Sequence, residues 1–157
     1  MMIVLDNCEH LTVSVALLAS TLSQIARRLH LLTTSQEPLK LQAERIYRVG
    51  TLSVPAGVTL TEAKETGAVR LFEARACAAD HRFLLDESNV AAVIDICTRL
   101  DGIPLAIELA AARVQLLCVQ GLQDRLGQRL LVLGGGSRCA PTRHRTLRAA
   151  LAWSHTL

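Results

Sequence analysis

Two hydrophobic patterns alternate over the first 34 residues. Residues 1–5 are a continuous apolar run that ends at Asp6, which predicts a strand buried on both faces. Apolar residues then recur in steps of four and three, as on one face of an amphipathic helix: Leu11, Val15, Leu18, Leu22, Ile25 and Leu29. Residues 30–34 predict a second short strand. A strand, a helix and a strand with short joints predict a right-handed βαβ unit with parallel strands.

The pattern changes after a linker. A further short strand is predicted at residues 46–49, and residues 50–60, which contain two glycines and a proline, form the linker. Helical spacing follows at residues 68–79 and again at residues 90–100. The sequence Asp101-Gly-Ile-Pro104 then ends one helix and begins the next, because glycine suits the left-handed position past a helix end and proline suits a first helical turn.

The rest of the chain is also predicted to be helical. The segment from Pro104 to about Leu117 is apolar on nearly all sides, which predicts a central, buried helix. A short helix is expected at residues 122–130, and the glycine-rich residues 134–137 indicate a flexible joint. Residues 144–157 predict one more helix.

Composition favours an aliphatic, helix-rich fold. The 157 residues include 28 leucines and 21 alanines but only four aromatic residues, and half of the chain is hydrophobic, which argues against intrinsic disorder. No apolar run reaches the roughly 18–20 residues of a membrane span. The N-terminus meets Asp6 too early for a signal peptide. We therefore expect a soluble, cytoplasmic protein with no membrane partner.

Cysteine spacing and charge exclude some classes of site and leave one open. The five cysteines are scattered and form no CxxC pair, so the sequence supports neither a disulfide framework nor a zinc ribbon. Within the formal net charge of +3, basic residues gather near the C-terminus, at Arg138, Arg143, Arg145 and Arg148. This cluster fits either an exposed basic linker or a nucleic-acid-binding patch.

Candidate chemistry lies at the ends of the two predicted strands. Parallel sheets bind ligands beyond the carboxyl ends of their strands, where Asp6 and the segment Thr34-Ser35-Gln36 would share one crevice. An acid after an apolar strand is the Walker B arrangement, in which the carboxylate holds Mg²⁺. An aspartate that merely caps the following helix gives the same pattern. Asp6 is therefore a candidate either for binding a metal ion or for capping the helix, and the residue pattern alone leaves both roles open.

A phosphate-binding loop is missing from the 157 residues. The pattern GxxxxGK[ST] needs a lysine directly after a glycine, but Lys40 follows a leucine and Lys64 follows an alanine. The chain by itself should not hold a triphosphate in the usual way. The sequence also contains no GxSxG or HExxH motif that would indicate another hydrolase.

Four segments taken in order resemble one known class of proteins. They read MIVLDNCEHL at 2–11, LLTTSQEPL at 31–39, RLDGIPLAIELAAAR at 99–113 and RHRTLRAALAWS at 143–154. Together they resemble the STAND or NB-ARC signal-transduction ATPases, P-loop NTPases found in bacterial LuxR-type and AfsR-type transcriptional regulators.

That resemblance implies an α/β fold in three parts. Residues 1–56 would be the C-terminal half of a P-loop NTPase domain, a partial parallel sheet that carries the Walker B strand. Residues 57–133 would be an all-α, ARC-like helical subdomain. Residues 134–157 would be a linker and the first helix of a truncated winged-helix domain. The chain would then be an internal fragment without the Walker A motif.

The resemblance also implies roles for individual residues near the strands. Asp6 matches the acid that coordinates Mg²⁺ through water. Asn7 stands where many relatives have a second acid that serves as catalytic base, and Glu9 is a candidate substitute. Thr34-Ser35-Gln36 matches a Thr-Ser-Arg sensor of the terminal phosphate, but Gln36 cannot supply the charge or the fork of donors of an arginine.

One further block would contribute to the nucleotide site from the helical part. Gly102, Pro104 and Leu105 match a GxP block whose proline packs near the adenine. Without any nucleotide, Gly102 and Pro104 would still suit the junction between two helices.

Three functional hypotheses follow. The first is a fragment of an ATP/ADP-dependent regulatory switch linked to transcriptional regulation, with no efficient hydrolysis and no tightly bound cofactor of its own. Its partners would be a missing P-loop segment or other modules of the regulator, and it would act on DNA only indirectly. The second is a non-catalytic protein–protein interaction module that could self-associate, because the edge of its sheet is unpaired. The third is a small basic DNA-binding protein.

Overall fold

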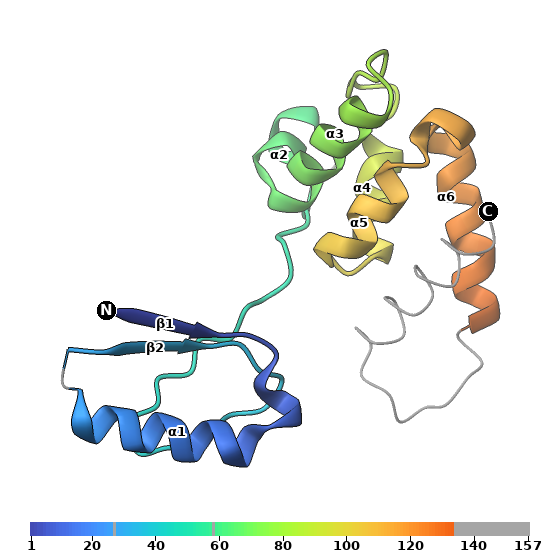
Figure 1. The fold of residues 1–157 in the computed structure, drawn as a ribbon. Helices are drawn as coiled ribbons and strands as arrows, with labels where there is room; N and C mark the ends of the chain where they lie inside the picture. The colour runs from blue at the N-terminus through green and yellow to red at the C-terminus, as the bar shows by residue number, and fades with distance from the viewer. Residues whose placement is uncertain (27, 58, 134–157) are drawn as a thin grey trace. The chain divides into compact units, whose positions relative to one another are not determined.

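The computed structural model describes residues 1–26, 28–57 and 59–133, and the chain divides into two compact units, Met1–Val49 and Gly50–Leu157 (Figure 1). The division falls at the start of the predicted linker. The predicted joint at 134–137, the helix at 144–157, the four C-terminal arginines and the winged-helix segment all lie outside the described residues.

The first unit is a βαβ arrangement. Its two strands pair in parallel, with Met2 opposite His30 and Leu5 opposite Thr33, which confirms the parallel pairing predicted from the sequence. One helix connects them and lies along one face of the sheet (Figure 1). The elements are β1 (Met2–Leu5), a short 3-10 helix η1 (Cys8–His10), α1 (Thr12–Ile25) and β2 (His30–Thr33).

Two details of the first unit differ from the prediction. The helix ends at Ile25 and not near Leu29, because Ala26 leaves the helical region at φ −124° and ψ 81°. The strand predicted at 46–49 is wrong, since these residues adopt no regular structure. Tyr47 in this segment is 88% exposed. Strand preference depends on packing against a neighbouring strand, and this apolar segment has no ladder partner.

The second unit is all helical in its described part, as the sequence predicted. It contains α2 (Leu60–Glu65), α3 (Gly67–Ala79), α4 (Val90–Arg99), α5 (Pro104–Ala111) and α6 (Val114–Leu133). Helix α3 packs against α5, and α4 packs against α6. Thr59 caps the start of α2, because its hydroxyl accepts the Glu62 N–H at 3.4 Å and donates to the Glu62 carboxylate at 2.6 Å.

The single buried helix predicted from Pro104 to about Leu117 is wrong. The chain bends by 117° between α5 and α6, so that the second helix packs on α4. Neither helix is buried on all sides, since Leu105 is 46% exposed and Leu116 is 74% exposed. The short helix predicted at 122–130 is part of α6, which contains a break at Cys118 (φ 54°, ψ 168°).

The hydrophobic core of the second unit centres on α3. Phe72 is fully buried and meets Phe83 edge to face, with ring centroids 6.2 Å apart. Polar contacts link the helices around this core. Arg75 on α3 pairs with Glu108 on α5 at 2.9 Å. Across residues 1–26, 28–57 and 59–133, no single helix is long and apolar enough to cross a membrane, and only α5 and α6 taken together across their bend have the necessary length and composition.

Candidate functional site

The carboxyl ends of β1 and β2 are joined by backbone hydrogen bonds that continue past the strands. The Thr34 N–H donates to the Leu5 carbonyl oxygen at 2.9 Å, and the Cys8 N–H donates to the Thr34 carbonyl oxygen at 2.9 Å. The turn after β1 therefore folds across the end of β2. This edge, formed by residues 6–9 and 34–36, is called the strand-end edge below.

The side chains of Asp6 and Thr34 meet at the strand-end edge. The Thr34 hydroxyl donates to the Asp6 carboxylate and accepts the backbone N–H of Asn7 at 2.9 Å. Asn7 adopts the left-handed conformation at φ 59° and ψ 48°, which asparagine tolerates better than most residues. This turn aims the Asn7 N–H at Thr34. The expected proximity of the acid after the first strand and the polar segment after the second is confirmed.

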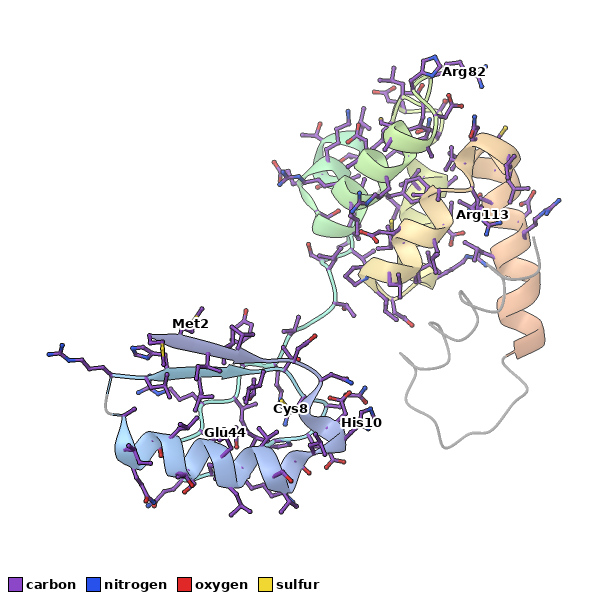
Figure 2. The ribbon with its side chains drawn as sticks, in the orientation of Figure 1. Met2, Cys8, His10, Glu44, Arg82 and Arg113 are labelled. Carbon is purple, nitrogen blue, oxygen red and sulfur yellow. The ribbon has the colours of Figure 1, made fainter. Side chains whose placement is uncertain are left out.

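The other predicted residues of the first unit also lie at the strand-end edge. The Gln36 amide donates to the Glu9 carboxylate at 3.4 Å, so the candidate base and the candidate sensor contact each other. The Ser35 hydroxyl accepts the Glu37 N–H at 3.2 Å and shapes the turn after β2. Cys8 and His10, which lie in the turn after β1, are labelled in Figure 2.

Cys8 anchors this edge, which the sequence did not indicate. Its side chain is buried, and its thiol donates to the Leu5 carbonyl oxygen at 3.4 Å (Figure 2). In the sequence it was one of five scattered cysteines with no distinguishing context. Its position in the first turn after an apolar strand was the one available signal.

The donor set of the strand-end edge suits a hard cation only in part. Asp6 is exposed and lies beside a hydroxyl, and Mg²⁺ in proteins is commonly held by one or two carboxylates, water and substrate phosphates. Among the described residues, no group of three or more His, Cys, Asp or Glu side chains is placed to hold a metal ion. Asp6 and Thr34 therefore fit a water-bridged Mg²⁺, whose remaining ligands would have to come from a nucleotide and water.

Gly102, Pro104 and Leu105 lie at the α4–α5 turn of the second unit. Gly102 has φ 64°, and its N–H donates to the Cys97 carbonyl oxygen at 3.1 Å, as expected past a helix end. Its carbonyl oxygen accepts the Leu52 N–H at 2.9 Å. Pro104 and Leu105 are exposed in the first turn of α5. The helix-junction role of Gly102 and Pro104 is thus observed. That these three residues meet the strand-end edge stays a prediction.

A hollow of about 430 Å³ in the second unit was not predicted from the sequence. It lies between the α3–α4 loop and the start of α6, and Arg82 in that loop is labelled in Figure 2. Hydrogen bonds from Arg82 lower the pKa of the Asp80 carboxyl, and hydrogen bonds from Ser88 lower that of Asp86. These carboxylates are thus ionised and already bound within their own loop. The polar stretch between two apolar helices was the sequence signal for this loop.

Comparison with known proteins identifies mycobacterial relatives. All 157 residues match a Mycobacterium tuberculosis H37Rv protein, provisionally named an HTH-type transcriptional regulator, at 42% identity. A Mycobacterium bovis protein with the same type of name matches equally well. A second M. tuberculosis H37Rv protein, named only as uncharacterized, is 36% identical over 156 residues. The chain spans 17% of the length of the first relatives and 37% of the last. No protein-family model and no solved structure matches the chain.

Proposed function

We propose that this chain is part of a nucleotide-dependent regulatory switch in a transcriptional regulator, and that the strand-end edge is the Walker B side of its Mg²⁺–nucleotide site. The observation that carries the proposal is the hydrogen bond between Asp6 and Thr34 at the carboxyl ends of two parallel strands. Ligands of open α/β sheets bind at this end of the strands. The link to transcription rests on the name of the 42% identical mycobacterial relatives.

Each residue of the edge has a part in this proposal. Asp6 holds Mg²⁺ through a water molecule, and the Thr34 hydroxyl fixes the orientation of that carboxylate. Gln36 takes the place of a sensor for the terminal phosphate, and its amide lies on Glu9. A neutral amide supplies neither the charge nor the donor fork of an arginine, so we expect Gln36 itself to contribute little to the discrimination between ATP and ADP.

The phosphate-binding loop would be contributed by polypeptide outside these 157 residues, which contain no GxxxxGK[ST] pattern. Gly102, Pro104 and Leu105 would approach the base from the second unit when the nucleotide is bound. In this proposal the bound nucleotide shifts the population between two arrangements of the modules, through contacts that differ between ADP and ATP. The chain alone should hydrolyse ATP no faster than buffer does.

Paramagnetic broadening by Mn²⁺, used in place of Mg²⁺, tests the metal site on the full chain. We expect Mn²⁺ to broaden the amide NMR signals of Asn7 and Thr34 first, because both amides lie in the turns that flank the Asp6 carboxylate. Asp6→Asn removes the charge with little change in shape and should abolish this selective broadening.

Asp124→Asn is the matched control, since Asp124 is an exposed aspartate on α6, in the second unit. This variant should respond to Mn²⁺ as the unchanged chain does. Broadening that is spread over many surface carboxylates, or that survives in Asp6→Asn, would refute the metal site. Efficient ATP hydrolysis by the chain alone would refute the proposed dependence on a separate phosphate-binding loop.

A further inference from the structure

Glu44 closes the loop that follows β2. Its carboxylate accepts two neighbouring backbone N–H groups, from Leu39 at 2.9 Å and from Lys40 at 2.8 Å. Its own N–H donates to the Leu41 carbonyl oxygen at 3.1 Å. Glu44, which is labelled in Figure 2, is half-buried although the residues on either side of it are exposed. Residues 35–44 contain no helix or strand but thus form a closed loop, called the post-β2 loop below.

The backbone at Lys40 shows what this carboxylate does. Lys40 has φ 59°, in the left-handed region that a residue with a long side chain adopts only where the surrounding structure imposes it. Successive N–H groups in a turn of this kind can point to one side and form a concave site for an anion. Here the Glu44 side chain fills that site. Because hydrogen bonds to a carboxylate are stronger than those between neutral groups, Glu44 stabilises a turn that Lys40 alone would not favour.

Further restraints continue from this closure toward β2. Pro38 directly precedes Leu39, and its ring fixes φ. The Glu37 N–H donates to the Ser35 hydroxyl at 3.2 Å. The backbone between the Glu44 carboxylate and the end of β2 therefore has little freedom.

Gln36 lies within this restrained segment. Its side-chain amide donates to the Glu9 carboxylate at 3.4 Å, in the turn after β1. This hydrogen bond is long and exposed, so it is too weak to hold the post-β2 loop in place by itself. The fixed backbone around Gln36 is what keeps its amide on Glu9.

We infer that Glu44 is a positioning residue: by closing the post-β2 loop, its carboxylate holds the Gln36 amide against Glu9 at the strand-end edge. Glu44 acts through the backbone of residues 39–40 and not by contact with a metal ion or a nucleotide. In the proposed switch Gln36 occupies the sensor position for the terminal phosphate, so the loop presents this position in a preformed arrangement. That role in sensing rests on the proposed function, whereas the control of Gln36 by Glu44 does not.

Amide hydrogen exchange and NMR on the full chain test this control. Glu44→Ala removes the acceptor of the Leu39 and Lys40 N–H groups, whose exchange should become at least about tenfold faster. The nuclear Overhauser effect between the Gln36 side-chain amide and the Glu9 side chain should disappear in the same variant. Glu44→Gln retains one oxygen acceptor, so it should keep one of the two amides protected and weaken this effect only in part.

Glu37→Ala is the matched control. It removes the same charge from the same loop, while the hydrogen bond to Ser35 comes from the Glu37 backbone and is kept. Exchange and the Overhauser effect should both be as in the unchanged chain. Circular dichroism checks that each variant is folded, and Glu44→Gln gives the same comparison if the alanine variant is not.

Two results would overturn the inference. Unchanged exchange of the Leu39 and Lys40 amides in Glu44→Ala would show that the carboxylate does not close the loop. Faster exchange with an intact Overhauser effect between Gln36 and Glu9 would show that Glu44 closes a local turn without positioning Gln36.

Mn²⁺ separates this inference from the proposed function. Selective broadening at Asn7 and Thr34 tests the metal site, and Glu44→Ala should preserve it, because the bonds from Thr34 to Asp6 and Leu5 lie outside the post-β2 loop. If the unchanged chain shows no selective broadening, the metal site is refuted and the exchange results still decide the role of Glu44. If the broadening is present but the Overhauser effect is insensitive to Glu44→Ala, the metal site stands and the inference about Glu44 is wrong.

Discussion

Replacement of Gly102 by alanine separates a structural role of this glycine from a role in ligand binding. Gly102 has φ 64°, in the left-handed region that costs an alanine about 1–2 kcal/mol. A Cβ atom at this position would lie 2.2 Å from the Leu52 carbonyl oxygen, a backbone atom that cannot rotate away. The two backbones must therefore separate, and the hydrogen bond from the Leu52 N–H to the Gly102 oxygen is lost with them.

The expected cost follows from these contributions. Strain contributes about 1–2 kcal/mol, and the lost hydrogen bond adds about 0.5–1.5 kcal/mol. The reduced freedom of the unfolded chain returns about 0.4–1 kcal/mol. We therefore expect Gly102→Ala to lower the free energy of unfolding of the second unit by about 2 kcal/mol or slightly more, because the close contact adds to the other costs. Urea denaturation followed by circular dichroism measures this change. The m-value, which is the slope of the free energy of unfolding against urea concentration, should stay the same.

Two other glycines provide matched controls. A Cβ at Gly50 would meet nothing within 4 Å, so Gly50→Ala should change stability by less than about 0.5 kcal/mol. At Gly121, inside α6, the nearest atom would be the Leu117 Cβ at 3.9 Å, an ordinary contact. Gly121→Ala should stabilise the helix by about 0.5–1 kcal/mol. If Gly102→Ala were as stable as Gly50→Ala, the helix-junction explanation would be wrong and a role in ligand binding would be the remaining reason for this glycine.

Two further predictions concern ionisable groups of the second unit. Burial raises the pKa of the Cys97 thiol to about 12, so iodoacetamide near pH 8 should label the exposed Cys118 well before Cys97, and equal rates in a peptide map would contradict the structure. Burial tends to raise the pKa of the Asp95 carboxyl, but hydrogen bonds from Arg99 and Gln123 outweigh it and lower the pKa. The stabilisation by this carboxylate is thus present above its unfolded pKa near 3.8 and is lost as the pH falls through the lower folded value. Asp95→Asn should cost about 0.5 kcal/mol at neutral pH and less in acid, as judged from urea midpoints, and a cost that does not depend on pH would refute this assignment.

Features that depend on local chemistry were predictable from the sequence. The apolar run that ends at Asp6 and the polar residues after the second strand were sufficient to place Asp6 and Thr34 together, because the carboxyl ends of neighbouring parallel strands share one edge. The junction at Gly102 and Pro104 was predictable for a similar reason, since a left-handed glycine and a first-turn proline act over a few residues.

Features that depend on distant packing were not predictable. The run from Pro104 to Leu117 is apolar throughout, so its periodicity contains no mark of the 117° bend, which is set by the packing of α6 on α4. The segment at 46–49 has the composition of a strand, but a strand also needs a neighbour with which to pair. The hydrogen bond between Gln36 and Glu9 depends on the turn geometry at Asn7, which a residue pattern does not specify.

Helix α1 shows how far periodicity alone can describe a core. Its predicted apolar stripe divides in the structure, because Val15 and Leu22 are half-buried whereas Leu11, Leu18 and Ile25 are 64%, 46% and 76% exposed. The exposed residues recur every seven positions and so lie along one side of the helix. A two-stranded sheet is too narrow to cover an apolar stripe of this width. The periodicity thus identifies surface that is suited to burial but does not identify the partner.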